Sequence, residues 1–349
     1  MTDATLTREH LNRALLARQL LLARADVPLP RALERMAGLQ AQYAPSMYVG
    51  LWSRVARFRR DHLTRALERR EVVQGTLMRS TIHLVSGEDY WPLTLGVREA
   101  RRAAWVRVSR RGLTAEQLAE AADRLRAALA DGPLRRQEIE DLLGDRLVVN
   151  GVGLWVDLVR IPPSGTWERR RADLYELAER WLGPPPAELS PEEAVRHLVR
   201  RYLEGFGPAP PSDVANWAGL PVADVVAALE RLNGLRRFSG EGGGELFDLS
   251  HAPLPAPDTA ATVRFLPTWD ATLLVHARRT GILPEEYRPK VFNTRTPQSV
   301  ATFLVDGRVA GTWRYAKGEG IVTEPFGRLD RATQRELDEE GERLAELHR

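Results

Sequence analysis

Hydrophobic residues recur at helical spacing near the start of the chain. Leu11, Leu15 and Leu22 fall along one face of a segment that begins near Thr7, and this spacing predicts a helix. Prolines open a second helix over 28–36, and the glycine at position 38 is expected to end it.

The next apolar segment, SMYVGLWSRVARF, also has helical periodicity. Tyr48, Leu51, Trp52 and Val55 stand at i, i+3, i+4 and i+7, which predicts an amphipathic helix. Another helix is expected over 61–70. It precedes VVQGTLMRSTIHLV, where two β-branched runs around a turn-like centre predict a β-hairpin.

Two later segments follow the same order of helix, short helix, helix and hairpin. In residues 113–186, a helix from about Thr114 is followed by a short helix after Pro133 and a third over roughly 150–160. Residues 187–255 end in LRRFSGEGGGELFDL, which reads as a glycine-turned hairpin. Helix, helix–turn–helix and hairpin is the winged-helix arrangement.

From about residue 260 the sequence pattern becomes typical of β-strands, and the VDGR sequence between alternating apolar runs is a strong hairpin signal. The overall prediction is an α+β fold, mainly α, with three tandem winged-helix units that form a concave surface and a C-terminal β-barrel-like region with a terminal helix. The expected boundaries are 1–112, 113–186, 187–255 and 256–349.

The amino-acid composition excludes several classes of protein. Hydrophobic residues make up 43% of the chain and charged residues 28%, and no apolar run approaches the length that spans a bilayer. There is no cysteine, so disulfides and thiolate metal sites are excluded, and a cytoplasmic protein with no membrane partner is expected. Only Lys290 and Lys317 are lysines, which leaves little scope for Schiff-base chemistry.

Gln40 and Gln42 follow the predicted helix stop and are separated by one residue. In extended backbone such residues share one face, so the two amides could project together. They would then supply carbonyl acceptors and N–H donors that can orient a water molecule. An amide has no useful basicity, so a reaction that used this pair would need a leaving group that is already activated.

Three stretches resemble one protein family: GLQAQYAPSMYVGLWSRV, LMRSTIHLVSGEDYW and RFLPTWDATLLVH are similar to the AlkZ-type winged-helix DNA glycosylases. The resemblance covers most of the chain. The family's catalytic Gln-x-Gln motif falls on Gln40 and Gln42, whereas the related YcaQ-like branch has Gln-x-Asp. The resemblance implies hydrolytic release of N-alkylated purines, without a cofactor, from duplex DNA. Some members of the family resist natural-product alkylators.

The chemistry of the residues agrees with that implication. An N7-alkylated guanine is cationic, so its glycosidic bond needs only a positioned water and electrostatic stabilisation of the transition state. We therefore expect a monofunctional DNA glycosylase that acts as a monomer. The alternative is a non-enzymatic winged-helix regulator, and a third, weaker option is a protein that sequesters a drug.

Several residues are candidates for DNA contact. Arg79, Thr81 and His83 alternate along the first predicted hairpin and could meet DNA, or could be a solvated charge and a structural histidine. Arginines gather at 98–111 and 168–171, where they could follow phosphates or form solvated surface.

The VDGR hairpin offers Asp306, Gly307 and Arg308 as a probe of a DNA groove, or as a plain turn. The seven histidines show no paired spacing such as H-E-x-x-H, so no metal site is assigned.

Overall fold

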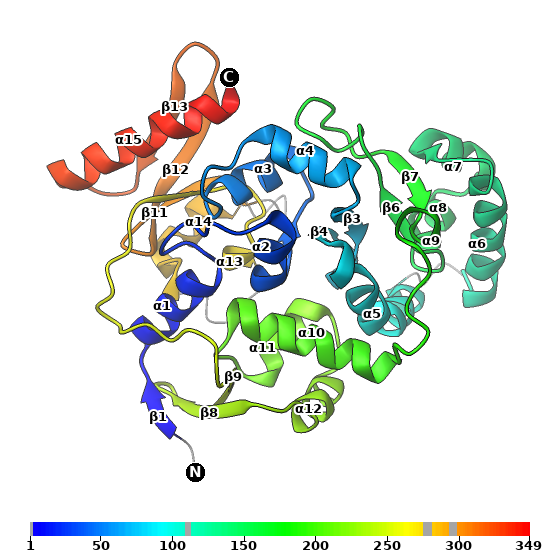
Figure 1. The fold of residues 1–349 in the computed structure, drawn as a ribbon, viewed down its shortest axis with the longest axis horizontal. Helices are drawn as coiled ribbons and strands as arrows, with labels where there is room; N and C mark the ends of the chain where they lie inside the picture. The colour runs from blue at the N-terminus through cyan, green and yellow to red at the C-terminus, as the bar shows by residue number, and fades with distance from the viewer. Residues whose placement is uncertain (1–2, 109–112, 275–280, 293–298) are drawn as a thin grey trace.

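The computed structural model describes residues 3–108, 113–274, 281–292 and 299–349. Its fold is α+β, with helices grouped around three sheets (Figure 1). Two of the predicted helix starts are capped by a side chain: the hydroxyls of Thr7 and Thr114 accept from the N–H of His10 and Gln117.

The first segment contains five helices and one hairpin. The helices are α1 (Arg8–Arg18), α2 (Leu29–Met36), α3 (Ala44–Trp52), α4 (Arg60–Glu68) and α5 (Gly87–Val108). The strands are β1 (Asp3–Leu6), β2 (Leu39–Gln40), β3 (Val72–Thr76) and β4 (Ile82–Ser86). The short 3-10 helix η1 (Met78–Ser80) joins β3 to β4. The predicted hairpin is confirmed by the antiparallel pairing of β3 with β4.

The prediction that the helix containing Tyr48 is amphipathic is wrong. All nine residues of α3 are buried, because the helix lies between two layers. A methyl group added at Gly50 would lie 3.4 Å from Leu39 of β2 and 3.6 Å from Pro267 of the C-terminal segment. A helix that is covered on both sides needs no polar face.

The second segment contributes strands to the same sheet as the first. Its elements are α6 (Ala115–Leu129), β5 (Leu134–Arg135), α7 (Arg136–Leu143), α8 (Arg146–Val152), β6 (Leu158–Arg160), β7 (Leu174–Leu177) and α9 (Ala178–Leu182). The six-stranded sheet has the order β2-β4-β3-β6-β7-β5. The helix predicted over roughly 150–160 lies earlier, because Gly153 caps α8 and the chain is strand from Leu158.

The third segment contains α10 (Pro191–Phe206), α11 (Pro211–Ala218), α12 (Val222–Glu230), β8 (Leu235–Gly240) and β9 (Glu245–Leu249). Its predicted hairpin is present, and β1 (Asp3–Leu6) adds to β8 in parallel. Helix α10 packs tightly on α5, since a methyl group at Gly96 would lie 3.0 Å from the carbonyl oxygen of Ala194. The winged-helix assignment and the segment boundaries stay predictions.

The C-terminal segment is not the predicted barrel. Its elements are β10 (Arg264–Leu266), α13 (Ala271–Leu274), η3 (Glu285–Tyr287), α14 (Arg288–Val291), β11 (Thr302–Val305), β12 (Arg308–Ala316), β13 (Gly320–Pro325) and α15 (Arg331–His348). The four strands form an open antiparallel sheet, β10-β11-β12-β13, within the described ranges. Helix α15 covers it, with Leu337 and Leu344 in one core with Phe265 and Phe303. Helix α15 therefore buries the apolar face of the sheet, which a closed barrel would otherwise enclose.

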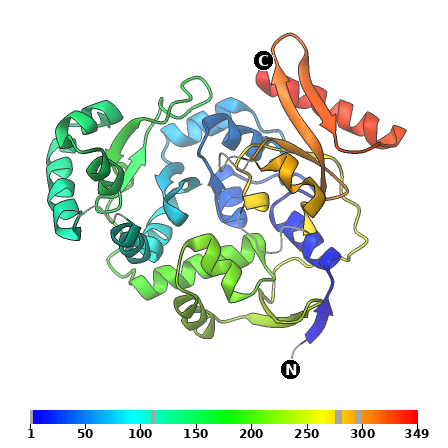
Figure 2. The ribbon, with the colours of Figure 1, turned by 180° about the vertical axis from the view of Figure 1, so that it is seen from behind.

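A buried ion pair fixes α3 to this C-terminal segment. Arg54, just after α3, donates two hydrogen bonds to Asp270 (3.0 and 2.9 Å), and both side chains are fully buried. The helix that follows the Gln-x-Gln motif is therefore held from its far end. Figure 2 shows the C-terminal sheet beside this central group of helices.

Candidate active site

Gln40 lies on the short strand β2, which a glycine brings against β4. Gly38 has φ +78°, and an added Cβ would lie 2.9 Å from Val85 Cγ1 and 3.0 Å from the carbonyl oxygen of Leu84. Only glycine suits that approach. Gln40 then pairs directly with His83, so the two side chains project from the same face of the sheet.

Gln42 leaves the strand and turns to solvent. The Ala41 N–H donates to the carbonyl of Ile82 (2.8 Å), but the Ile82 N–H donates to the side-chain Oε1 of Gln42 (3.3 Å). The side chain of Gln42 thus replaces a backbone acceptor and is fixed at the end of β2. Extended backbone would give the two glutamines the same environment, but their exposures differ: Gln42 is exposed, whereas Gln40 is only 7% exposed.

His83 is a buried, neutral partner of Gln40. Its Nδ1 lies 3.0 Å from the carbonyl of Thr81, so the ring donates from that nitrogen. Burial, with smaller contributions from the nearby Arg79 and Arg101, lowers the pKa of His83 to about 3. The imidazole is therefore uncharged at neutral pH, and its 3% exposure keeps it from solvent.

Arg79 and Thr81 lie at the tip of the same hairpin. Arg79 has φ +51° and donates through Nη1 to the carbonyl of Trp217, next to the turn at Gly219. Burial lowers the pKa of Arg79 to about 10. The Thr81 hydroxyl donates to the carbonyl of Met78 (3.1 Å). Both residues stay predictions as DNA contacts.

The VDGR hairpin is present, and its tip packs on α1. Asp306 and Gly307 both have positive φ (45° and 74°), as a tight hairpin turn requires. Asp306 pairs with Arg13 (2.6 Å) and Arg308 with Glu9 (2.8 Å). These three residues are thus engaged within the chain, and their DNA contact stays a prediction.

Three arginines of α5 are also engaged internally, whereas Arg107 near its end is exposed. Arg98 pairs with Asp157 (2.7 Å), Arg101 donates to the carbonyl of Thr76, and Arg102 donates to that of Leu154 (2.9 Å). The end of the predicted stripe, 109–111, lies outside the described residues.

Sequence reasoning missed a contact between the motif and the second segment. Arg170, in the loop between β6 and β7, donates to the hydroxyl of Tyr43 (3.1 Å), the residue after Gln42. Tyr43 is 42% exposed. The available signal was the tryptophan in GTWERRR, an apolar residue within a polar loop.

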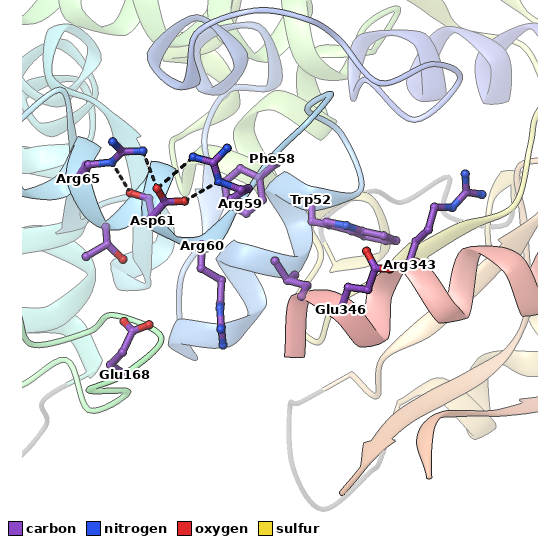
Figure 3. Close-up of a pocket in the computed structure, with 11 residues that line it drawn as sticks. Trp52, Phe58, Arg59, Arg60, Asp61, Arg65, Glu168, Arg343 and Glu346 are labelled. Atoms are coloured by element: carbon purple, nitrogen blue, oxygen red, sulfur yellow. Dashed lines mark hydrogen bonds and ion pairs between the residues drawn. The ribbon is translucent and has the colours of Figure 1, made fainter. Parts of the chain in front are cut away.

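A cavity of about 570 Å³ lies beyond the far end of α3 (Figure 3). Arg60 of α4, Glu168 of the β6–β7 loop and Arg343 of α15 contribute to its wall. Asp61 pairs with Arg59 (3.1 Å) and Arg65 (2.6 Å) at its rim. Since α3 spans about 13 Å, the cavity is separate from Gln42.

The described part of the chain offers neither a metal-binding cluster nor a membrane-spanning helix. No three His, Asp or Glu side chains there gather in a way that could hold a metal ion. No helix there combines the length and apolar character that crossing a membrane requires.

Comparisons with known proteins define the class. The solved structure of Streptomyces sahachiroi DNA glycosylase AlkZ superposes with a TM-score of 0.80 at 21% identity, over 96% of this chain and 95% of that one. This similarity shows the shared fold. The Streptomyces sahachiroi protein described as "Interstrand DNA cross-link repair glycosylase" is 24% identical over 360 residues, which cover 94% of this chain and 93% of that protein.

The profile of the family described as "DNA glycosylase AlkZ-like" matches residues 33–347. The chain therefore belongs to the AlkZ-like DNA glycosylase family. This assignment confirms the resemblance drawn from the sequence and the predicted enzyme class, a DNA glycosylase.

Proposed function

We propose that this protein hydrolyses the N-glycosidic bond of N7-alkylated purines in duplex DNA, and that Gln40 and Gln42 position the attacking water. The observation that carries the proposal is the placement of the Gln-x-Gln motif of the AlkZ-like family. Gln42 is exposed with its oxygen held by the Ile82 N–H, and Gln40 is buried opposite His83 on the neighbouring strand. The Ile82 N–H occupies one of the two lone pairs of the Gln42 carbonyl oxygen, so this oxygen can also accept from a water molecule, and the amide nitrogen stays available as a donor.

The reaction needs no strong acid or base. Water attacks the anomeric carbon, the bond from that carbon to the purine nitrogen breaks, and its electron pair neutralises the cationic base. The water proton passes to solvent. Neutral amides suffice to orient the water and to stabilise the positive charge that develops on the sugar. The neutral His83 supports the geometry of Gln40 and supplies no proton at neutral pH.

The proposed substrates include bulky and cross-linked adducts. The name of the Streptomyces sahachiroi relative refers to interstrand cross-links, and an exposed Gln42 suits adducts too large for a closed base pocket. We propose that a single copy of the chain engages the duplex, with Arg79 and Thr81 at the edge of the contact.

A direct test incubates the protein with a duplex that contains N7-methylguanine. The proposal predicts free N7-methylguanine and alkali-labile sites, and no protein–DNA adduct after borohydride treatment, since water and not an amine attacks. Borohydride trapping of the protein would contradict a water-only mechanism. Tight binding to an undamaged sequence with no base release from any alkylated duplex would favour the regulator.

A further inference from the structure

The loop between β6 and β7, residues 161–173, has a fixed conformation. Here it is called the Trp167 loop. The Ser164 hydroxyl donates to the carbonyl of Arg171 (2.7 Å) and accepts from the Asp173 N–H (2.7 Å). Gln74 of β3 donates to the carbonyl of Gly165 (3.0 Å). The Ser164 bonds join the two arms of the loop to each other, and the Gln74 bond ties one arm to the sheet. Little entropy therefore remains to be lost when the loop binds a ligand.

Trp167 holds the tip of this loop against three helices. Its ring is 6% exposed and makes edge contacts with Tyr48 of α3 (5.6 Å) and His348 of α15 (5.1 Å). The guanidinium groups of Arg60 and Arg170 lie 5.2 and 5.8 Å from the ring. Burial lowers the pKa of His348 to about 4, so its ring adds no charge beside these arginines.

The residues after Trp167 present positive charge to solvent. Arg169, Arg170 and Arg171 are exposed, and with Arg135 they line a cavity of about 270 Å³. Asp173 lies 3.0 Å from Arg171 and 3.6 Å from Arg135 and balances that pair. Within the described residues, no carboxylate lies within 4 Å of Arg169 or Arg170. Arg98 and Arg101 of α5, in contrast, are bonded inside the fold.

The contact with Tyr43 places this charge beside the catalytic motif. Arg170 reaches across from the second segment to the Tyr43 hydroxyl, one residue from Gln42. A rigid loop with two guanidinium groups that have no carboxylate partner among the described residues suits the oxygens of a phosphodiester, which planar guanidinium groups bind well.

We propose, resting on the proposed function, that Arg169 and Arg170 bind backbone phosphates of the DNA strand that carries the adduct. Tyr43 is then a positioning residue, because its bond to Arg170 joins the phosphate contact to the segment that holds Gln42. Phosphate contacts of this kind fix the register of the duplex and carry no sequence information.

The test measures how strongly salt weakens binding to a duplex with a tetrahydrofuran abasic site, which needs no chemistry. Each phosphate contact contributes about 0.9 to the slope of log Kd against log salt concentration. The double variant Arg169→Gln/Arg170→Gln should lower the slope by about 2. It should also slow single-turnover base release at saturating protein several-fold, because it removes the bond from Arg170 to Tyr43. Arg231→Gln is the control, since Arg231 is exposed and follows α12 on the opposite side of the molecule from the Trp167 loop (Figures 1 and 2).

A double-variant slope equal to that of the control would overturn the phosphate assignment. Tyr43→Phe keeps the ring and removes the bond to Arg170, so base release at saturating protein should fall several-fold with the salt slope unchanged. Unchanged release by Tyr43→Phe would overturn its positioning role. Failure of the wild type to release any alkylated base would instead overturn the proposed function, because the salt slope is measured without catalysis.

Discussion

The neutral, buried His83 gives stability a pH dependence that can be calculated. The ring is the cross-strand partner of Gln40, is 3% exposed, and donates from Nδ1 to the carbonyl of Thr81. Burial lowers its pKa to about 3, against about 6.5 for an unfolded histidine. The His83 ring therefore binds a proton much more weakly in the folded state than in the unfolded chain.

The sign and size follow from linkage. Between pH 6.5 and pH 3 the unfolded state binds more protons at this site, so the free energy of unfolding falls as the pH falls. At pH 5 the pKa of the unfolded histidine lies about 1.5 units above the pH, so the free energy of unfolding is lower by about 2 kcal/mol. At pH 7.5 this decrease is close to zero.

Urea unfolding at pH 7.5 and pH 5.0 measures this effect. The wild type should lose about 2 kcal/mol more between these pH values than His83→Gln, which keeps a donor for Thr81 but does not titrate. His251→Gln, at an exposed histidine, is the control and should behave as the wild type does. Equal losses in the wild type and His83→Gln would refute the neutral, buried state of His83.

Further predictions concern the packing that holds the site. Asp248→Ala should lower the free energy of unfolding by about 3–5 kcal/mol in urea titrations, because it leaves the fully buried Arg18 without its carboxylate (2.6 Å); a loss below 1 kcal/mol would contradict this. Gly307→Ala should cost about 1–3 kcal/mol and lower the thermal midpoint, since φ is +74° and the new Cβ meets Leu16 Cδ1 at 2.5 Å. Trp167→Ala should release the Trp167 loop and expose it to trypsin, and an unchanged digestion pattern would show that the ring does not hold the loop.

Local chemistry was sufficient to predict many elements. The hydroxyl at Thr7 starts α1, and Asp306 with Gly307 forms the turn between β11 and β12, because caps and tight turns depend on neighbouring residues. The same reasoning placed Gly38 at the end of α2, where its positive φ is observed. Such signals act over a few residues and survive in any tertiary context.

Long-range pairing could not be predicted in this way. Nothing in the sequence around Gln74 indicates that β3 pairs with β6 of the next segment, or that β1 joins β8. The burial of α3 on all sides depends on Pro267, more than 200 positions later in the chain. Hydrophobic periodicity predicts that one face of a helix is exposed, but it cannot show that a distant segment of the chain covers that face.

The same distinction between local signals and long-range contacts applies to the candidate site. The glutamine pair was found from its residue types and the family resemblance. The different exposure of Gln40 and Gln42 follows from the bond between Ile82 and the Gln42 side chain, which no pattern encodes. The contact of Arg170 with Tyr43 likewise joins residues 127 positions apart.

The central claim is that two neutral side-chain amides direct water to an already cationic nucleotide. The most direct measurement is the single-turnover rate of N7-methylguanine release by Gln40→Ala and Gln42→Ala at saturating protein. Loss of a preorganised polar group typically costs about 10²–10³ in rate, and that decrease is expected for each variant, with folding of Gln42→Ala intact because the side chain is exposed. Release by both variants at the wild-type rate would contradict the account.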